Sequence, residues 1–472
     1  MLTTLAAPAF AKTWHIEDVD ITVKAGETEG TNKVSQGANQ EVEDTDTIIK
    51  NREDTASSNT VTINAEDKND KVEVTLKDVN IDTSNRNKAA VSVTGSGNTT
   101  IKLDGDNHLT GGNGIYSNSI GSLTISGGTV TATGGGSTGS NGLGGRGICS
   151  DSGGVTISGG TVKAAGGNGS DGGSGISSSS GVTVSDGTVT ANGGNGGNVS
   201  GDGIRSDGGV TISGGTVKAA GGDSKDGYGG DGIRSGGGVT ISGNTVNAAG
   251  GNGGKVGGYG ICSFDRVAIS GGTVEAAGGS SGSSNGGSGI YSSVIDLSGS
   301  LELTAKAGSP NGKALSQRGN ELDLNTIKDK LGPGAKVTTT DADGKVIAQV
   351  PIPRPVEPEE PSSSSDGGSA APSAPVSSLP GLTVTDKSGA VISYTSTQSG
   401  NTLTVCVGRL TASLHVSLAA LRQLRAEGIE TIAFQTILCS TTLSVDELLA
   451  MGGEDAEVVL THRFTDSSLT VG

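Results

Sequence analysis

A row of arginines, tyrosines and cysteines at one position of a repeated motif is the feature of this sequence that could carry chemistry. The motif is Gly-Ile-x-Ser, and its variable residue is in turn Tyr116, Cys149, Ser177, Arg205, Arg234, Cys262 and Tyr291. If the copies stack, Arg205 and Arg234 become neighbours, and their guanidinium groups repel unless acidic groups or the carboxylates of a ligand lie between them. Asp202, Asp207 and Asp231 are near in sequence. The row therefore predicts either a charge-balanced surface or a site for uronate sugars.

Aspartates in glycine-rich segments form a second candidate site. Carboxylate and carbonyl oxygens are the ligands that a hard cation such as Ca²⁺ prefers. Asp202 and Asp231 hold equivalent positions in consecutive copies, so their carboxylates are expected close enough to share an ion. Asp171, Asp104 and Asp106 are the other candidate metal ligands. Ordinary solvated turns are the alternative explanation for all five.

Residues that interrupt the repeat are where an enzyme would keep its catalytic groups, either acids around a metal with a basic residue or a pair of carboxylates. Such interruptions are scarce. The clearest is Phe264-Asp265-Arg266, which replaces a Ser-Gly-Gly turn and follows Tyr259. We predict no catalytic residue, and we expect Tyr259 and Arg266 to join Tyr116, Arg205, Arg234 and Tyr291 as ligand-binding residues.

The repeat itself predicts the elements that position these side chains. Seven copies run from Gly114 to Ile290 with a period close to 28 residues, and each holds three short strand-like runs separated by glycine. Runs such as Val155-Thr156-Ile157-Ser158 alternate with the period of two that is typical of strands. Three such strands cannot bury an apolar face alone, so the copies must stack as a three-sided parallel β-helix.

Stacking predicts two inward ladders of apolar side chains, which would form the core. The first ladder consists of Ile115, Ile148, Ile176, Ile204, Ile233, Ile261 and Ile290. The second consists of Ile125, Ile157, Val184, Ile212, Ile241, Ile269 and Leu297. The serines that recur after these ladders are expected to turn corners and to bond neighbouring backbone groups.

Composition excludes several classes of protein. The chain of 472 residues has 84 glycines but only one Trp, five Tyr and four Phe, which excludes an ordinary globular core of large side chains. A net charge of −17 repels phosphate backbones and makes nucleic-acid binding improbable. No run after the N-terminus approaches the ~20 apolar residues of a membrane span.

The organisation along the chain follows from shifts in composition. Leu2 to Ala11 end in the small-x-small pattern of a signal-peptidase site, which indicates a secreted protein. In the final segment Cys406 and Cys439 could form a disulfide. The predicted parts are a signal-peptide remnant (1–11), an N-terminal cap with irregular coils (12–110), regular repeats (111–308), a C-terminal cap with a hairpin (309–350), a Pro/Ser-rich linker (351–380) and a small α+β domain (381–472).

The repeated module Gly-Gly-Val-Thr-Ile-Ser-Gly-Gly-Thr-Val-Lys-Ala at 153–164 and 208–219, with the strand patterns at 72–81 and 100–105, resembles a known family. These are the secreted carbohydrate-binding β-helix proteins of clostridia and related gut Firmicutes, which have a polysaccharide-lyase-like fold. The resemblance covers about residues 70 to 308. It implies a right-handed helix, calcium in some members, and binding of cellulose or acidic plant-wall sugars without known catalysis.

Taken together, these features predict an all-β secreted protein that binds extracellular polysaccharide, with calcium as an optional cofactor and without catalysis. The first alternative is a structural adhesin or stalk that binds a cell-wall or host surface protein. The second alternative is a polysaccharide lyase. Neither nucleic acid nor a membrane span is expected.

Overall fold

The computed structural model contains two compact units, Met1–Pro358 and Glu359–Gly472. The described residues are 11–137, 142–350, 381–386, 390–392, 394–399, 401–407, 411–436, 440–451, 457–463 and 466–471. Residues 1–10 of the predicted signal-peptide remnant and the predicted linker 351–380 lie outside them.

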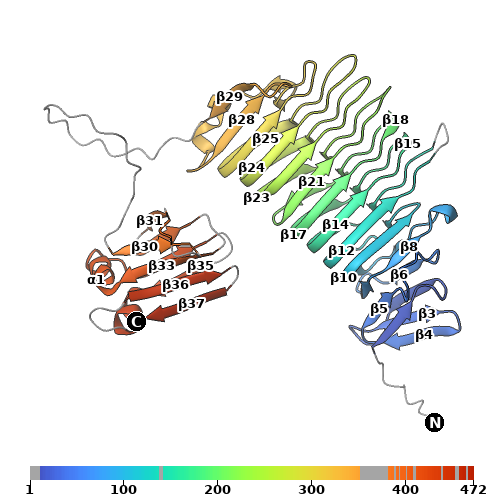
Figure 1. The fold of residues 1–472 in the computed structure, drawn as a ribbon, viewed down its shortest axis with the longest axis horizontal. Coiled ribbons are helices and arrows are strands. Elements are labelled where there is room, and N and C mark those ends of the chain that lie inside the picture. The colour runs from blue at the N-terminus through green and yellow to red at the C-terminus, as the bar shows by residue number, and fades with distance from the viewer. Residues whose placement is uncertain are drawn as a thin grey trace, which may run out of the picture. The chain divides into compact units, whose positions relative to one another are not determined.

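The first unit is a three-sided parallel β-helix, as the repeat predicted. It has about 12 turns with a spacing of about 28 residues, and its strands pair in parallel from coil to coil (Figure 1). Seven strands of the first face carry the Ile-x-Ser motif: β11 (Ile115–Ser117), β13 (Ile148–Ser150), β16 (Ile176–Ser178), β19 (Ile204–Ser206), β22 (Ile233–Ser235) and the starts of β24 (Ile261–Ala277) and β25 (Ile290–Lys306). Strands without the motif continue this face at its two ends: β2 (Ile21–Ala25), β6 (Val61–Ala65), β9 (Val91–Gly95) and β26 (Leu315–Gln317).

The second and third faces are formed largely by long strands that bend at a glycine. These strands are β10 (Asn98–Gly111), β12 (Leu123–Gly134), β14 (Val155–Ala165), β17 (Gly181–Asn192), β23 (Gly238–Ala249) and the later parts of β24 and β25, with β20 (Gly209–Ile212) and β21 (Thr216–Ala220) sharing one coil. Shorter strands complete the two faces at the ends of the helix. They are β1 (Lys12–His15), β5 (Thr47–Lys50), β7 (Lys71–Lys77), β8 (Asn80–Asp82) and β28 (Lys336–Thr340).

Both predicted apolar ladders are confirmed in full. Each isoleucine of the first ladder pairs with the next from Ile115 to Ile290, and the second ladder runs in register from Ile125 to Leu297. All fourteen side chains are fully buried. Since burying one such side chain contributes about 1.5–3 kcal/mol, these ladders supply much of the driving force for stacking.

The serine of each Gly-Ile-x-Ser motif is buried, and some of these hydroxyls bond the backbone, whereas those of Ser150 and Ser206 have no hydrogen-bond partner among the described residues. Ser178 donates to the carbonyl of Gly153 (2.9 Å) and accepts from the N–H of Gly181 (3.1 Å). Ser235 bonds Gly208 and Gly238 in the same way. These hydroxyls satisfy backbone groups at the corner where the chain leaves the first face.

Glycine-rich loops join the third face to the next first-face strand, and their two legs are held together by their backbones. In each coil a glycine N–H of one leg donates to a glycine carbonyl of the other, and the chain of bonds continues into the next coil: Gly222 donates to Gly201, Gly230 to Gly222, and Gly251 to Gly230 (2.8–2.9 Å). Side chains cannot enter this contact, because a Cβ at Gly230 would lie 1.9 Å from the carbonyl oxygen of Gly201. Short strands β15 (Gly169–Asp171) and β18 (Gly196–Val199) pair within the loops.

The N-terminal segment 12–110, predicted as a cap with irregular coils, consists mostly of coils. Coils begin at β1, which already pairs in parallel with β5, because Trp14 packs into the core and donates from Nε1 to the buried Asp44 (2.7 Å). Only β3 (Asn32–Gln36) and β4 (Asn39–Asp44) form an antiparallel extension of β2. The helix therefore covers most of residues 12–110, and only the antiparallel strands β3 and β4 depart from the coils.

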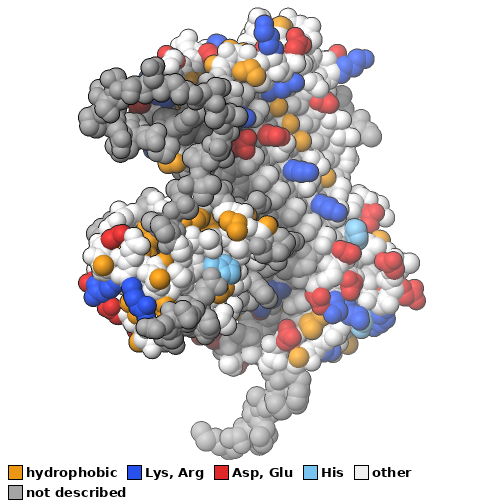
Figure 2. All heavy atoms as spheres, turned by 60° about the vertical axis from the view of Figure 1, so that its left-hand side comes forward, with side chains coloured by type: hydrophobic (Ala, Val, Ile, Leu, Met, Phe, Trp, Pro, Cys, Tyr) orange, Lys and Arg blue, Asp and Glu red, His pale blue; other side chains and the backbone are white. Residues whose placement is uncertain are grey.

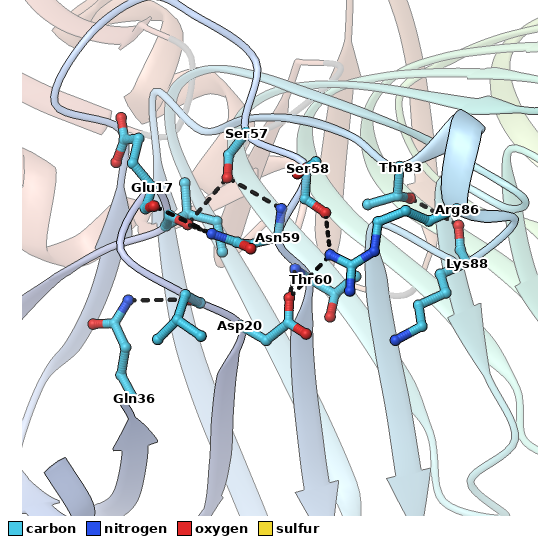
Figure 3. A network of polar contacts seen from close by, with 12 residues as sticks. Glu17, Asp20, Gln36, Ser57, Ser58, Asn59, Thr60, Thr83, Arg86 and Lys88 are labelled. Atoms are coloured by element: carbon cyan, nitrogen blue, oxygen red, sulfur yellow. Dashed lines mark hydrogen bonds and ion pairs between the residues drawn. The ribbon is translucent and has the colours of Figure 1, made fainter. Parts of the chain in front are cut away.

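A polar network fastens the first corners of the helix (Figure 3). Asn59 donates to the carbonyls of Ile16 (2.9 Å) and Glu17 (3.2 Å), and the N–H of Thr60 donates to Asp20 (2.7 Å). One coil later Arg86, which ends the 3₁₀ turn η1 (Ser84–Arg86), donates to the carbonyl of Ser58 (2.6 Å). These bonds replace the regular loop contacts where the coils are irregular.

At the other end the predicted hairpin is confirmed. β28 pairs antiparallel with β29 (Val346–Val350), while β26 pairs with β27 (Asn320–Glu321). The 3₁₀ turns η2 (Leu324–Thr326) and η3 (Lys328–Lys330) lie between them. Leu324, Ile327 and Leu331 are buried against the last coil and close the core.

The second unit is α+β, as predicted. One sheet contains β30 (Leu382–Thr385), β33 (Thr411–Ser417), β36 (Glu457–Arg463) and β37 (Asp466–Val471), and the other contains β31 (Thr395–Ser399), β32 (Thr402–Cys406), β34 (Thr431–Gln435) and β35 (Ser440–Ser444). Helices α1 (Leu418–Ala426) and α2 (Val445–Met451) complete it. Ser417 caps α1 through Ala420, as the sequence indicated. The suggested disulfide between Cys406 and Cys439 is wrong, because Cys406 is a free thiol that donates to the side-chain oxygen of Gln435 (3.3 Å), while Cys439 lies outside the described residues.

The glycine contacts give a test of the loop structure. Replacing Gly230 with Ala should lower the free energy of unfolding by about 1–3 kcal/mol, the usual effect of overpacking, because the new methyl group collides with a backbone oxygen. Thermal unfolding followed by circular dichroism measures this. Gly209→Ala is the matched control, since its Cβ would lie 3.6 Å from the nearest atom and its unfolding temperature should hardly change.

Candidate functional site

The middle of the predicted row of variable residues, Ser177, Arg205 and Arg234, forms the floor of a groove along the first face. Tyr116, Cys149, Ser177, Arg205, Arg234, Cys262 and Tyr291 pair in register across seven coils. The glycine-rich loops rise beside this row and form one wall, with Leu143, Asp171, Val199, Tyr228, Val256 and Asn285 aligned along their outer part. Parallel stacking thus brings together residues about 28 positions apart in sequence.

The expectation that this row is an exposed surface is wrong for three of its members. Cys149, Ser177 and Cys262 are buried, whereas the Arg205 side chain is 48% exposed and that of Arg234 is 35% exposed. The residues do point away from the core, as alternation requires, but the loops fold over them. Ser177, Arg205 and Arg234 therefore form the bottom of a hollow, from which the two arginines emerge.

Two adjoining hollows make up the groove. One encloses about 440 Å³ and is lined by residues that include Arg146, Asp151, Asp171 and Asp207. The other encloses about 360 Å³ and is lined by residues that include Asp231, Arg234, Tyr228 and Tyr259. Val199, Ser200, Asp202 and Arg205 line both, so the two hollows form one continuous depression.

Asp202 and Asp231 stand at equivalent positions of consecutive coils, three residues before the two arginines. Each accepts a backbone N–H from the coil that follows: Asp202 from Asp231 (2.8 Å), and Asp231 from Tyr259 (2.7 Å). Asp231 also pairs with Arg234 (3.1 Å), and Asp202 lies 3.7 Å from Arg205. The acids that we expected between the arginines are present, and they hold the guanidinium groups in place.

Burial decides the protonation of these carboxyl groups. Their side chains are only 8% and 5% exposed, so loss of hydration raises the pKa of both. Burial together with repulsion from Asp202 raises the pKa of Asp231 to about 7. The bonds from Tyr259 and Arg234 lower this pKa without cancelling the cost of burial.

Tyrosines occur at both ends of the row. Tyr116 donates to Asp151 (3.0 Å), which also pairs with Arg146 (3.4 Å). Tyr259 stacks on Tyr291 with their ring centroids 4.9 Å apart, and burial raises the pKa of Tyr259 to about 12. Tyr259 therefore remains neutral in ordinary buffers, and the stacked pair presents an aromatic surface beside Arg234.

Three of the predicted site residues are not brought to this groove. Arg266 forms an ion pair with Asp296 and lines a separate hollow on the second face, because the corner after Ser263 turns its side chain away. Asp104 pairs with Lys77, and the N–H of Asp106 bonds Asp78, at the bend of β10. They belong to the corner between the second and third faces.

The aspartates do not fit a calcium ion well. Calcium takes six to eight oxygen ligands, whereas Asp202 and Asp231 each face a guanidinium group and already accept an N–H. Asp171 lies on the loop wall, in register with Leu143 and Val199. Among the residues that the structure describes, no three His, Cys, Asp or Glu side chains are grouped as a metal site would need.

Sequence reasoning missed several residues of the groove. Arg146 and Asp151 flank Cys149 but interrupt no motif. Tyr228 is 48% exposed on the loop wall. Phe264, which the sequence showed only as an interruption of the repeat, places its ring centroid 5.1 Å from the guanidinium carbon of Arg234. The sequence could have indicated these residues only by their position. Each lies within five residues of the variable position of a Gly-Ile-x-Ser motif, or in the loop just before it.

Comparisons with known proteins support the fold. A family model described as a beta helix repeat matches residues 123–145, 155–180 and 210–233. Searches of curated proteins and of solved structures gave no match. The chain is therefore a parallel β-helix protein, with β-helix repeats that coincide with the coils of the groove.

Two further surface features bear on partners. On the face drawn in Figure 2, basic and acidic side chains are interspersed and hydrophobic ones are scattered. Within the described segments, no helix is long and apolar enough to cross a membrane.

The covered row predicts inert thiols. Burial raises the pKa of Cys149 to about 11 and also raises that of Cys262. Iodoacetamide at pH 8 should therefore modify both cysteines at least tenfold more slowly in the native protein than in the unfolded chain, since each pH unit below the pKa costs about tenfold in thiolate. Peptide mass mapping measures the two sites separately, and rapid native modification would contradict loops that cover the row.

Proposed function

We propose that this chain is a secreted, non-catalytic β-helix protein that binds extracellular polysaccharide, including acidic plant-wall glycans, in the groove of the first face. One observation carries the proposal. Two arginines protrude side by side from the groove floor, and each is paired with a buried aspartate. An acidic sugar is the ligand that such a pair of guanidinium groups can recognise through charge-assisted hydrogen bonds.

The shape and the aromatic groups of the groove support an extended ligand. Coils repeat at about 4.8 Å, so the groove offers a new set of side chains over a length comparable to that of one sugar unit. The stacked Tyr259 and Tyr291 lie beyond Arg234 and provide ring surface for the apolar face of a sugar. Tyr228 adds an exposed ring on the loop wall.

The absence of catalysis is part of the proposal. A glycosidase would need two carboxyl groups on opposite sides of the scissile bond, whereas Asp202 and Asp231 lie on the same wall and contact arginine. A lyase would need a free base near the sugar ring. Because a polysaccharide lyase is the alternative to a binding protein, the binding assay must also look for sugar products.

A specific observation favours an adhesin as a second candidate. The outer row of the loops exposes Leu143, Val199 and Tyr228 to 72%, 46% and 48%. A row of exposed apolar side chains along a ridge is typical of a surface that contacts another protein. In that case the loop ridge, and not the groove floor, would determine binding.

Binding to an array of plant and host polysaccharides, with and without calcium, tests the proposal. Arg205→Gln/Arg234→Gln should weaken binding of acidic glycans about tenfold or more, because each charge-assisted hydrogen bond contributes about 1.5–3 kcal/mol. Lys163→Gln/Lys218→Gln is the matched control, since it removes two charges from exposed positions on the third face.

Each outcome has a defined meaning. Saturable binding that only the arginine variant loses supports the groove. Binding that both variants retain would place the site elsewhere, and failure to bind any glycan would overturn the proposal in favour of a protein partner. Release of unsaturated or shortened sugars would show catalysis.

A further inference from the structure

Asp231 is a buried acid that has no necessary role in the fold. Asparagine at its position could accept the same N–H from Tyr259, and the equivalent position of another coil, Ser174, carries no charge. Yet two successive coils place a carboxyl group here, each paired with one arginine. Burying two carboxyl groups costs free energy, and a role in the ligand site would explain why both are present.

The groups facing Asp231 come from three coils. Asp202 lies one coil before it, and Arg205 neighbours Arg234 on the floor. Arg234 contacts it from its own coil (3.1 Å), and Tyr259 and Cys262 approach from the coil that follows. With both acids ionised, the two guanidinium groups are neutralised. When one acid is protonated, the same four groups carry a net positive charge.

We propose that Asp231, with Asp202 beside it, is the proton-binding element of the groove, so that an acidic sugar is taken up together with one proton. The proton comes from solvent and neutralises the Asp231 carboxylate. The carboxylate of the sugar then replaces Asp231 as the ion partner of Arg234. This inference rests on the proposed function and adds to it that binding is favoured by acidic surroundings.

Burial of Asp231 sets the pH at which this exchange occurs. Because burial raises the pKa of Asp231 to about 7, the groove without ligand takes up its proton near neutral pH. The affinity for an acidic sugar should therefore be constant at low pH and should fall about tenfold for each unit above pH 7.

Calorimetric titration of the full chain with a galacturonate trisaccharide tests this, in buffers of different ionisation enthalpy. At pH 8 close to one proton should be taken up for each trisaccharide bound, and at pH 5.5 almost none. Asp231→Asn should abolish proton uptake and should bind more tightly than the wild type at pH 8. Asp223→Asn is the matched control, because Asp223 is an exposed loop carboxylate that also accepts an N–H from the following coil.

A second measurement needs no ligand. Because the pKa of Asp231 is raised by folding, its proton stabilises the native state below about pH 4, and this contribution is lost as pH rises through 7. The unfolding temperature of the wild type minus that of Asp231→Asn should thus be smaller at pH 8 than at pH 5.5. The Asp223→Asn comparison should show no such change.

The outcomes separate this inference from the proposed function. Trisaccharide binding that is independent of pH and takes up no proton would overturn the inference while leaving polysaccharide binding intact. Failure of every glycan to bind at every pH would overturn both. A tighter complex of Asp231→Asn at pH 8 could not result from misfolding and would support the proton exchange.

Discussion

The parallel pairing of each coil with the next, in a register that barely changes, is the constraint on which the rest of this structure depends. It places residues about 28 positions apart directly above one another at the spacing of adjacent strands. A residue type that recurs in the sequence therefore forms a continuous row along the helix. The isoleucines form the core, some of the serines bond backbone groups at the corners, and the glycines allow the two legs of each loop to bond through their backbones.

The same constraint explains why a site can form without a large globular core. The stacked loops hold a wall beside the first face with backbone bonds alone, so the floor residues need not support it. This freedom allows Tyr116, Ser177, Arg234 and Tyr291 to differ while the coil geometry stays constant.

Stacking also strengthens the interactions between charged side chains. Two acids or two arginines at equivalent positions of consecutive coils become close neighbours, although they are far apart in the sequence. Asp202 with Arg205, and Asp231 with Arg234, alternate in sign within the groove wall and floor, which balances the charges at high pH. Because the acids are buried and the arginines are not, protonation of the acids is the step that alters this balance.

The sequence by itself determined the repeat, the three-sided helix, both core ladders and the membership of the outward row, because each follows from a period of two within strands and about 28 between coils. It also placed Asp202 and Asp231 next to the arginines. Only the tertiary structure decided that the loops fold over Cys149 and Cys262, since loop direction depends on glycine contacts between coils that no local pattern records. The tertiary structure also decided the place of Arg266, because the corner that precedes it directs its side chain to the second face and away from the groove.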